Sequence, residues 1–420
     1  MKILWITNIL LSEASKYLNR DKLVVGGWMD SLLQSLKGEK NLTLGVASVY
    51  NGTEFISFEQ DEVRYFLIPL KGKTTKYNTS IELYWKKINT LFTPTVVHIH
   101  GTEHAHGLAM INSCPDVQYV LSIQGLVSVY ERYFYSGINI QEFLSSSTIK
   151  DVFRGSVFGG KRDYKRRGLL EKEYITKVEN IIGRTEWDKA HTYFINKKRN
   201  YFFCNESLRA AFYKSKYQWK IDNVVRYSIF LSQANYPIKG LHYVLKAVAL
   251  IKDEFPNVKI YVGGEDIIST KPFSRRVKRN GYAKYILKLI SDLELKNHIC
   301  FMGLLDEIEM AKRYQKSHVF VCPSSIENSP NSLAEAQVIG VPAIASYVGG
   351  VPNMINHRSS GLLYPFGEYE MLASYLIQLF KDDNLSQSIS SKSIKKARKR
   401  HDVESNKLRT IEIYESITKL

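Results

Sequence analysis

The stretch HVFVCPSSIENSPNSLAEAQVIGVPAIAS, residues 318–346, combines an apolar run, a polar turn, a helical pattern and a second apolar run. The first run predicts a buried strand, and the helix after it is predicted to begin at Pro330, with Ser329 as its cap. The helix is expected to end near Ile339, because Gly340 follows. Strand–helix–strand units of this kind build parallel sheets, so this stretch predicts an α/β fold.

The rest of the chain repeats this alternation of short apolar runs and amphipathic segments in two passes. The predicted strands are apolar on both faces, as in a parallel sheet that helices cover, so each half is expected to be a doubly wound sheet. The strands are predicted at 2–8, 42–50, 95–100, 119–125 and 180–184, and then at 227–233, 258–264, 299–303, 319–323, 342–346 and 361–365.

A polar stretch at 213–223 is the predicted domain boundary. The division expected from it is an N-terminal Rossmann-like domain, 1–222, and a C-terminal Rossmann-like domain, 223–402. The amphipathic segment 403–420 is able to pack back on either domain. Ligands of doubly wound sheets bind at the carboxyl ends of the strands, so two such domains are expected to face each other across a ligand-binding cleft.

The composition is that of an ordinary soluble protein, with 44% hydrophobic and 24% charged residues among 420. No apolar run approaches the roughly 18 residues of a membrane span. The N-terminal KILWITNIL is interpreted as a first strand rather than a signal sequence. The four cysteines lack metal-ligand spacing, which favours reduced thiols and a cytoplasmic protein.

The formal net charge of +17 predicts a surface that attracts anions. Nucleic acid, an anionic membrane face and phosphate-bearing substrates all fit this charge, and solvated helix faces are the plainer alternative. Three basic clusters contribute to it, at 161–167, 275–284 and 392–400.

The turn and helix start at 323–336 carry the most specific chemistry. The unpaired N–H groups near Asn331, Ser332 and Leu333 are expected to form an anion site for a phosphate. Glu335 lies one turn further along the same face, and Glu327 lies in the turn before the helix. Carboxylates on either side of a phosphate site suit a ribose and a hexose joined by a diphosphate, which is a nucleotide-sugar.

The sequence PSSIENSPNSLAEAQVIGVPAIASYVGGVPNMI resembles the donor-site signature of family-4 retaining glycosyltransferases, which have the GT-B fold of two Rossmann-like domains. The resemblance covers most of the second half and includes VKIYVGG, whose Gly263 it places among the donor-binding residues. It implies that Glu335 holds the ribose and Glu327 the donor sugar. It also implies that the Asn331–Leu333 amides hold the sugar and diphosphate.

The same resemblance gives Lys239, in SQANYPIKGLHYVL, the role of neutralising the leaving diphosphate. The family pattern places an arginine about five residues earlier, where this chain has Ala234. Arg184 is a conjectural replacement that would bind the donor, although an ion pair with Glu186 or Asp188 is an equal alternative.

Two features of the first half are interpreted beside this resemblance. The pair Gly26-Gly27 resembles the glycine-rich loop that approaches the diphosphate. Gln124 stands where many family members carry a histidine that contacts the donor, and an amide cannot shuttle protons.

The stretch HIHGTEHAH, residues 98–106, holds four histidines. Strand periodicity places His98 and His100 on one face, while His104 and His106 begin the next helix. A metal site is the less favoured interpretation. Polar residues lining the cleft are preferred, with His106 or His100 orienting the sugar or acceptor and His106 as a catalytic candidate.

These observations predict a retaining glycosyltransferase that moves a sugar from a nucleotide-sugar, expected to be UDP-linked, to a saccharide or lipid-linked glycan in cell-surface polysaccharide synthesis. No cofactor or metal is required, because no Asp-x-Asp motif is evident. The basic clusters predict peripheral contact with an anionic membrane at its inner face. No nucleic acid partner is expected, because the motifs favour a glycosyltransferase. The alternatives are a nucleotide-sugar epimerase of GT-B fold and a basic nucleic-acid-binding protein.

Overall fold

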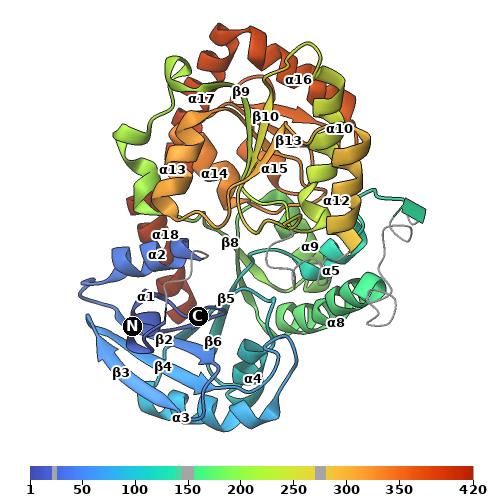
Figure 1. The fold of residues 1–420 in the computed structure, drawn as a ribbon. Helices are drawn as coiled ribbons and strands as arrows, with labels where there is room; N and C mark the ends of the chain where they lie inside the picture. Colours follow the sequence, from blue (N-terminus) through green and yellow to red (C-terminus); the bar gives the residue numbers. More distant parts are fainter. Residues whose placement is uncertain (21–25, 140, 143–155, 270–280, 420) are drawn as a thin grey trace. The chain divides into compact units, whose positions relative to one another are not determined.

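The computed structural model describes residues 1–20, 26–139, 141–142, 156–269 and 281–419. Its chain divides into two compact units, each with a sheet of its own (Figure 1). Unit 1 consists of Met1–Glu131, Tyr164–Leu208 and His401–Leu420, and unit 2 consists of Arg132–Asp163 and Arg209–Arg400.

The sheet of unit 1 has eight strands, all parallel to their neighbours except β3, which is antiparallel to β4. Their spatial order is β3 (Ile56–Gln60), β4 (Val63–Pro69), β2 (Thr43–Tyr50), β1 (Lys2–Thr7), β5 (Val96–His100), β6 (Gln118–Ser122), β7 (Asn180–Gly183) and β8 (Asn200–Phe203). The helices assigned wholly to this unit are α1 (Ser12–Tyr17), α2 (Gly27–Leu36), α3 (Glu82–Phe92), α4 (His106–Ser113), α5 (Val127–Tyr130), α9 (Glu186–Ile195) and α18 (Val403–Thr418).

Apolar cores lie on both faces of this sheet because the central strands are apolar on both sides. In β1, Leu4 and Ile6 join one cluster with Trp85 of α3. Ile3 and Trp5, which point the other way, join a second cluster with side chains of α2 and α18. Burial on both faces is what the continuous apolar run KILWIT predicts.

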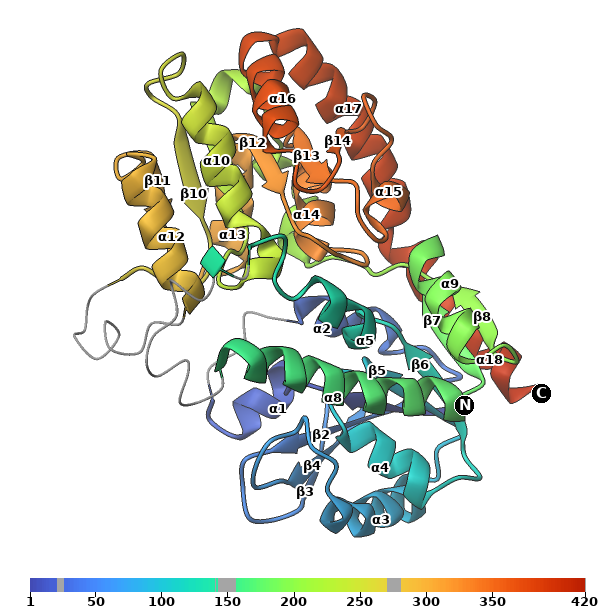
Figure 2. The ribbon, with the colours of Figure 1, turned by 90° about the vertical axis from the view of Figure 1, so that its right-hand side faces the viewer.

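The sheet of unit 2 has six strands, all parallel. Their order is β11 (Ile299–Phe301), β10 (Lys259–Val262), β9 (Val225–Leu231), β12 (Ser317–Cys322), β13 (Ala343–Ser346) and β14 (Leu362–Tyr364). Helices lie on both faces, namely α10 (Leu241–Ile251), α12 (Gly281–Asp292), α13 (Glu307–Lys316), α14 (Asn331–Ile339), α15 (Val351–Met354), α16 (Tyr369–Lys381) and α17 (Asp383–Arg400) (Figure 2). Short 3₁₀ helices precede β9 and α10, namely η3 (Ala210–Tyr213), η4 (Ser215–Tyr217), η5 (Ile221–Asn223) and η6 (Pro237–Lys239).

The predicted fold class is confirmed: the chain is α/β, with two Rossmann-like halves. Every strand that the sequence predicted is present within a few residues of its expected position. Three strands were missed, namely β3, β4 and β8. In the β3–β4 hairpin, Asp61 and Glu62 both adopt positive φ, 51° and 63°. Such a turn is usually signalled by Asn or Gly, and neither stands at these two positions.

The units interleave along the chain differently from the predicted division at 222/223. Residues 132–139 belong to unit 2, where Ile138 enters the apolar core and Tyr135 packs against it. Helix α8 (Ser156–Lys177) begins in the segment assigned to unit 2 and continues into unit 1. The last helix, α18, packs on α2 and β5 of unit 1.

The three basic clusters lie in different parts of the chain. Residues 161–167 lie in α8, and 392–400 form the last part of α17. Most of the cluster at 275–284 falls outside the described residues. Among the helices of the described ranges, none combines the length and the apolar character needed to cross a bilayer.

Candidate functional site

The helix start that the sequence singled out lies in unit 2, directly after β12. Helix α14 begins at Asn331 and ends at Ile339, with Gly340 in the left-handed region at φ 99°. Pro330, not Ser329, is the N-cap, because its ψ of 118° is still extended. The Ser329 hydroxyl points instead to Sδ of Met354, at 3.7 Å. The predicted cap was therefore wrong by one position.

The N–H groups at this helix start are only partly available to a ligand. The Leu333 amide donates to the Pro330 carbonyl at 3.0 Å, so its predicted role as a ligand donor conflicts with the structure. For the amides of Asn331 and Ser332, no protein acceptor is found among the described residues. Since unpaired amides at a helix N-terminus attract anions, these two are the donors left for a phosphate.

The turn before α14 is fixed by backbone contacts with two glycine-containing loops. The Ser325 amide donates to the Ile238 carbonyl at 2.9 Å, and the Gly350 amide donates to the Glu327 carbonyl at 3.0 Å. Gly349 has a φ of 51°, and a Cβ there would lie 1.9 Å from the Glu327 carbonyl oxygen. Gly349 is thus required for the close approach that positions Glu327.

Glu327 is 7% exposed and is held by two donors on one of its oxygens. Oε1 accepts hydrogen bonds from Nζ of Lys239 at 2.6 Å and from Oγ of Ser324 at 2.7 Å. No contact of Oε2 with another described residue is found, so this oxygen can accept a ligand hydroxyl. Glu327 is therefore buried and paired rather than solvated.

Lys239 comes from η6, in the loop after β9, and remains a cation. Burial acts to lower the pKa of its ammonium group, but the Glu327 carboxylate and Tyr236 outweigh burial and raise it well above its ordinary value. Only one of its three N–H groups is used in the described structure, by Glu327. Two donors are left for phosphate oxygens.

A small pocket of unit 2 brings these side chains together. Lys239, Ser324, Glu327 and Ser332 line it, with Ser232 and Gln233 from the end of β9 on another side. Gly263, at the end of β10, lies so close to this strand end that a Cβ would be 2.9 Å from the Ser232 carbonyl oxygen. Gly263 itself is not among the residues lining the pocket, and its donor-binding role stays a prediction.

Glu335, the second carboxylate, is also 7% exposed and paired. Its Oε1 accepts from Nη2 of Arg209 at 3.0 Å, and its Oε2 lies 3.3 Å from the Tyr314 hydroxyl. Burial raises the pKa of the Glu335 carboxyl above its ordinary value, while Arg209 and Tyr314 oppose that rise. Sequence reasoning missed both partners: Arg209 lies 126 residues away, and no pattern links it to Glu335.

Arg184, the conjectural replacement for the missing family arginine, lies at the end of β7 in unit 1. It is 4% exposed, and its Nη2 contacts Oε1 of Glu206 at 2.6 Å. Its Nη2 also donates to the Ile123 carbonyl at 3.0 Å, and its backbone N–H donates to Oδ2 of Asp188 at 3.0 Å. Its assignment to donor binding stays a prediction.

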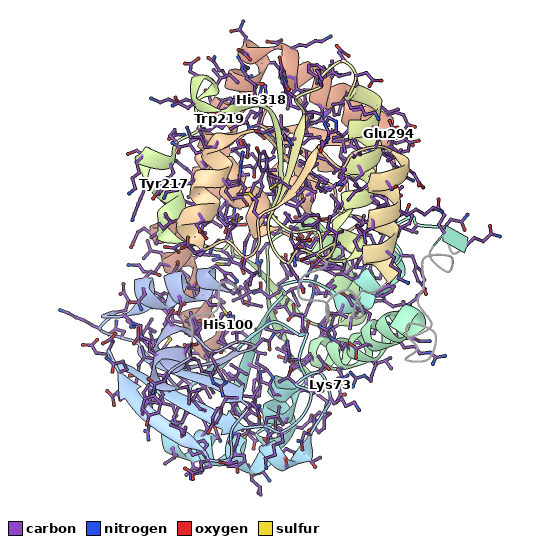
Figure 3. All side chains as sticks on the ribbon, in the orientation of Figure 1. Lys73, His100, Tyr217, Trp219, Glu294 and His318 are labelled. Atoms are coloured by element: carbon purple, nitrogen blue, oxygen red, sulfur yellow. The ribbon has the colours of Figure 1, made fainter. Side chains whose placement is uncertain are left out.

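The histidines of 98–106 are buried in unit 1. His98 and His100 share one face of β5, as predicted, with ring centroids 3.8 Å apart, and Figure 3 labels His100 at the end of this strand. His106 is the first residue of α4, and its Nε2–H donates to the Thr7 carbonyl at 3.2 Å. Burial lowers the pKa of His106 to about 3, so its imidazole is neutral at physiological pH. A catalytic role for His106 stays a prediction, limited to the neutral ring.

The other first-half candidates also lie in unit 1. Gly26 caps α2 with a φ of 77°, and a Cβ there would meet Ile9 at 2.0 Å, so the Gly26-Gly27 turn depends on glycine. Gln124 follows β6 and is half-buried. In the ranges that the structure describes, no group of three or more His, Cys, Asp or Glu side chains could hold a metal ion. That no metal is needed remains a prediction.

Residues 214–398 match the sequence model of the family described as glycosyl transferases group 1. The chain contains a glycosyl transferases group 1 domain. This domain includes Lys239, Glu327 and Glu335, whereas Arg209 lies just before its start. The match falls wholly within unit 2 and covers less than half of the chain.

Two curated relatives match parts of the same chain. N-acetyl-alpha-D-glucosaminyl L-malate synthase of Bacillus anthracis is 32% identical over 108 residues, which are 26% of this chain and 28% of the relative. Amylovoran biosynthesis glycosyltransferase AmsK of Erwinia amylovora is 30% identical over 96 residues, 21% of this chain and 24% of the relative. The chain spans less than half the length of the curated relatives it matches.

Solved structures extend the similarity to the whole fold of this glycosyltransferase-domain protein. Anabaena HepE, solved in complex with UDP and glucose, superposes with a TM-score of 0.67 at 15% identity, over 99% of this chain and 100% of HepE. At this identity the likeness shows the fold alone, which is the GT-B fold of that enzyme class. The family-4 assignment and the retaining stereochemistry stay predictions.

Proposed function

We propose that the protein is a retaining glycosyltransferase of the family-4 type. It transfers a sugar from a UDP-linked donor to a saccharide or lipid-linked glycan during synthesis of a cell-surface polysaccharide. The observation that carries this proposal is the buried Lys239–Glu327 pair in a pocket of the glycosyl transferases group 1 domain. The UDP and glucose bound by HepE and the amylovoran role of AmsK support the donor and the product class.

The donor-free geometry indicates how each group acts. The two unused N–H donors of Lys239, with the amides of Asn331 and Ser332, would bind the diphosphate. Oε2 of Glu327 would accept a hydroxyl of the donor sugar, and Glu335 would accept the ribose hydroxyls. Each of these hydrogen bonds involves a charged group, so each contributes roughly 1.5–3 kcal/mol.

The chemical step is the exchange of one glycosidic bond for another. The bond between the anomeric carbon and the β-phosphate oxygen breaks, and the electron pair stays on the phosphate. Lys239 stabilises the charge that develops there. The acceptor hydroxyl forms the new bond on the same face of the sugar, and its proton passes to the leaving phosphate. This step needs no protein nucleophile and no metal.

The test is transfer from a panel of radiolabelled UDP-sugars by the purified full chain, followed by product analysis. We expect UDP release with sugar incorporation, and a fall in kcat of roughly 10²–10³-fold for Glu327→Gln, typical of losing one transition-state contact. The matched control is Glu294→Gln: Glu294, labelled in Figure 3, is 83% exposed and pairs only with Lys252 among the described residues.

Other outcomes would favour the alternatives. Conversion of the donor sugar to its epimer without transfer would indicate an epimerase. Tight, salt-sensitive binding to nucleic acid that Glu327→Gln leaves unchanged, without sugar transfer, would indicate a nucleic-acid-binding protein.

The proposal also includes a location at the inner, cytoplasmic face of an anionic membrane, where lipid-linked acceptors occur. The net charge of +17 supports it, because each basic residue near such a surface contributes about 1 kcal/mol. Sedimentation with phosphatidylglycerol vesicles should exceed sedimentation with neutral vesicles and decline in high salt. Equal sedimentation with both would contradict this location.

A further inference from the structure

The setting of Glu335 raises a question that its proposed role does not answer. A carboxyl that is 7% exposed is driven towards its neutral form by burial, and a neutral carboxyl is a poor acceptor for a pair of hydroxyls. Some feature of the chain must therefore keep this side chain charged and oriented. The inference that follows rests on the proposed binding of the donor ribose by Glu335.

Two side chains from different elements contact this carboxylate. Arg209 precedes η3, and its Nη2 lies 3.0 Å from Oε1 of Glu335. Tyr314 belongs to α13, and its hydroxyl lies 3.3 Å from Oε2 and donates to the Ser332 carbonyl at 2.9 Å. The Arg209 guanidinium is itself fixed over the Phe212 ring, with Cζ 4.8 Å from the centroid.

The remaining acceptor capacity fits a vicinal diol. Each oxygen of a carboxylate accepts along two lone-pair directions. Arg209 uses one direction on Oε1 and Tyr314 occupies one on Oε2, so each oxygen keeps one direction for a ligand. One open position on each of two neighbouring oxygens matches two adjacent hydroxyls, and a 2′-deoxyribose offers only one of them.

We propose that Arg209 and Tyr314 are positioning residues, which hold Glu335 as an oriented carboxylate and thereby make the site select ribonucleotides over 2′-deoxyribonucleotides. Neither residue touches the reacting atoms. Arg209 supplies the charge, and the Tyr314 hydroxyl, held by the Ser332 carbonyl, limits the positions that Oε2 of Glu335 can take. The nucleotide moiety of the donor is thus recognised partly by residues outside the strand–turn–helix motif.

The experiment compares the dissociation constants of UDP and 2′-deoxy-UDP for the full chain between pH 6 and pH 8.5. Wild type should prefer UDP at least tenfold, with little dependence on pH. In Arg209→Gln, we expect the preference to fall at least tenfold at pH 6 and to recover as the pH rises, because Glu335 ionises only at higher pH without its cation. Arg209→Lys should restore most of the preference at all pH values.

The matched control is Arg226→Gln, because Arg226 also forms an ion pair within unit 2, with Asp383, but both side chains are more than 40% exposed. It should leave the UDP preference unchanged. Circular dichroism melts of each variant would show that Arg209→Gln folds, and Tyr314→Phe provides a second variant with a smaller expected loss of preference.

The outcomes separate the inference from the function on which it rests. If wild type prefers UDP but Arg209→Gln keeps that preference at every pH, the positioning role is wrong and the ribose contact stands. If Arg209→Gln weakens UDP and 2′-deoxy-UDP equally, Arg209 contacts the diphosphate and the inference is overturned. If wild type binds both nucleotides equally, Glu335 does not hold the ribose, and the proposed donor site fails together with the inference.

Discussion

At the scale of single residues, Glu327 and Glu335 are each paired with a cation in the structure. Lys239 contacts Glu327 at 2.6 Å, and Arg209 contacts Glu335 at 3.0 Å. Neither carboxylate could remain charged in so buried a position without such a partner. In the proposed donor complex, hydroxyls and phosphates would therefore be added to pairs that already exist, without burial of new protein charges.

Gly349, which lies against the backbone carbonyl of Glu327, gives a testable prediction. In Gly349→Ala, the new methyl group would lie 1.9 Å from the Glu327 carbonyl oxygen at a φ of 51°, so the loop must move. We expect a loss of stability of about 2 kcal/mol or more, which exceeds the roughly 1 kcal/mol cost of positive φ alone. Donor affinity should fall as well, and urea denaturation with nucleotide titration measures both effects.

Gly303→Ala is the control for this prediction. Gly303 also has a positive φ, 77°, but a Cβ there meets no atom within 4 Å. It should therefore show the backbone cost without the steric cost. Equal losses of stability in the two variants would contradict the argument that Gly349 serves the close approach to Glu327.

The sequence singled out Glu327, Glu335 and Lys239 because each lies in a short local stretch that resembles a family motif, residues 323–336 for the two acids and SQANYPIKGLHYVL for Lys239. It could not predict Arg209, since only the packing of η3 on α13 and α14 brings this residue to Glu335. The same reason explains why the ion pair between Arg184 and Glu206 was not predicted. Its partner Glu206 lies on the segment after β8, a strand too short and too polar at its start to be recognised.

At the scale of elements, α18 is anchored to the first sheet by one buried hydroxyl. The Tyr414 oxygen accepts from Nε1–H of Trp5 at 2.9 Å, so its own proton goes to Nδ1 of His98 at 2.7 Å. The Nε2–H of His98 then donates to Oγ of Ser122. This chain fixes the neutral tautomer of His98, in agreement with burial lowering the pKa of its imidazole to about 3.

Tyr414→Phe should therefore destabilise unit 1. The change leaves a buried indole N–H and a buried imidazole nitrogen without partners, at roughly 1–3 kcal/mol for each. We expect a loss of about 2–4 kcal/mol, which urea denaturation monitored by tryptophan fluorescence would measure. Tyr364→Phe is the control, because the Tyr364 hydroxyl is buried without a hydrogen bond to any described residue. A neutral result for Tyr414→Phe would exclude the anchoring role.

The predicted helices and strands agree with the structure for most of the chain, but β4 was missed although most of its residues are buried. Helix α14 ends at Ile339 as expected, because Gly340 stops it. The pattern was weakest for β3, an edge strand whose residues are mostly exposed or half-buried. An edge strand with so many exposed residues lacks the apolar run by which its neighbours are recognised.

At the scale of the whole molecule, buried imidazoles make stability depend on pH. Burial lowers the pKa values of histidines in both units, to about 3 for His98, His106 and His242, and to about 4 for His104 and His318. An unfolded histidine binds a proton below about pH 6.5. Stability is therefore fully present above that pH and is lost as the pH falls towards the native values.

Buried acids with raised pKa values change the pH dependence of stability in the opposite direction, but such acids are fewer than the histidines among the described residues. Burial raises the pKa of Glu103 to about 7, and it also raises the pKa values of Glu171 and Glu335. Each unit still contains more such histidines than such acids among the described residues with a resolved shift. We therefore expect a lower melting temperature at pH 5 than at pH 7.5, with about 1.4 kcal/mol lost per pH unit for each net proton that the unfolded chain binds. An equal or higher melting temperature at pH 5 would contradict this balance.

The assignment of residues 132–139 to unit 2 has a practical consequence for protein engineering. An exchange of nucleotide-binding halves between enzymes of this fold is naturally planned as one cut near residue 209 and another near residue 400. A transplant made in this way would leave behind Ile138, whose side chain fills part of the second core, and the Ser136 carbonyl, which the buried His242 ring contacts at 3.0 Å. Chimaeras that carry residues 132–139 along with the second half should remain soluble, whereas those cut only at the two later sites should aggregate.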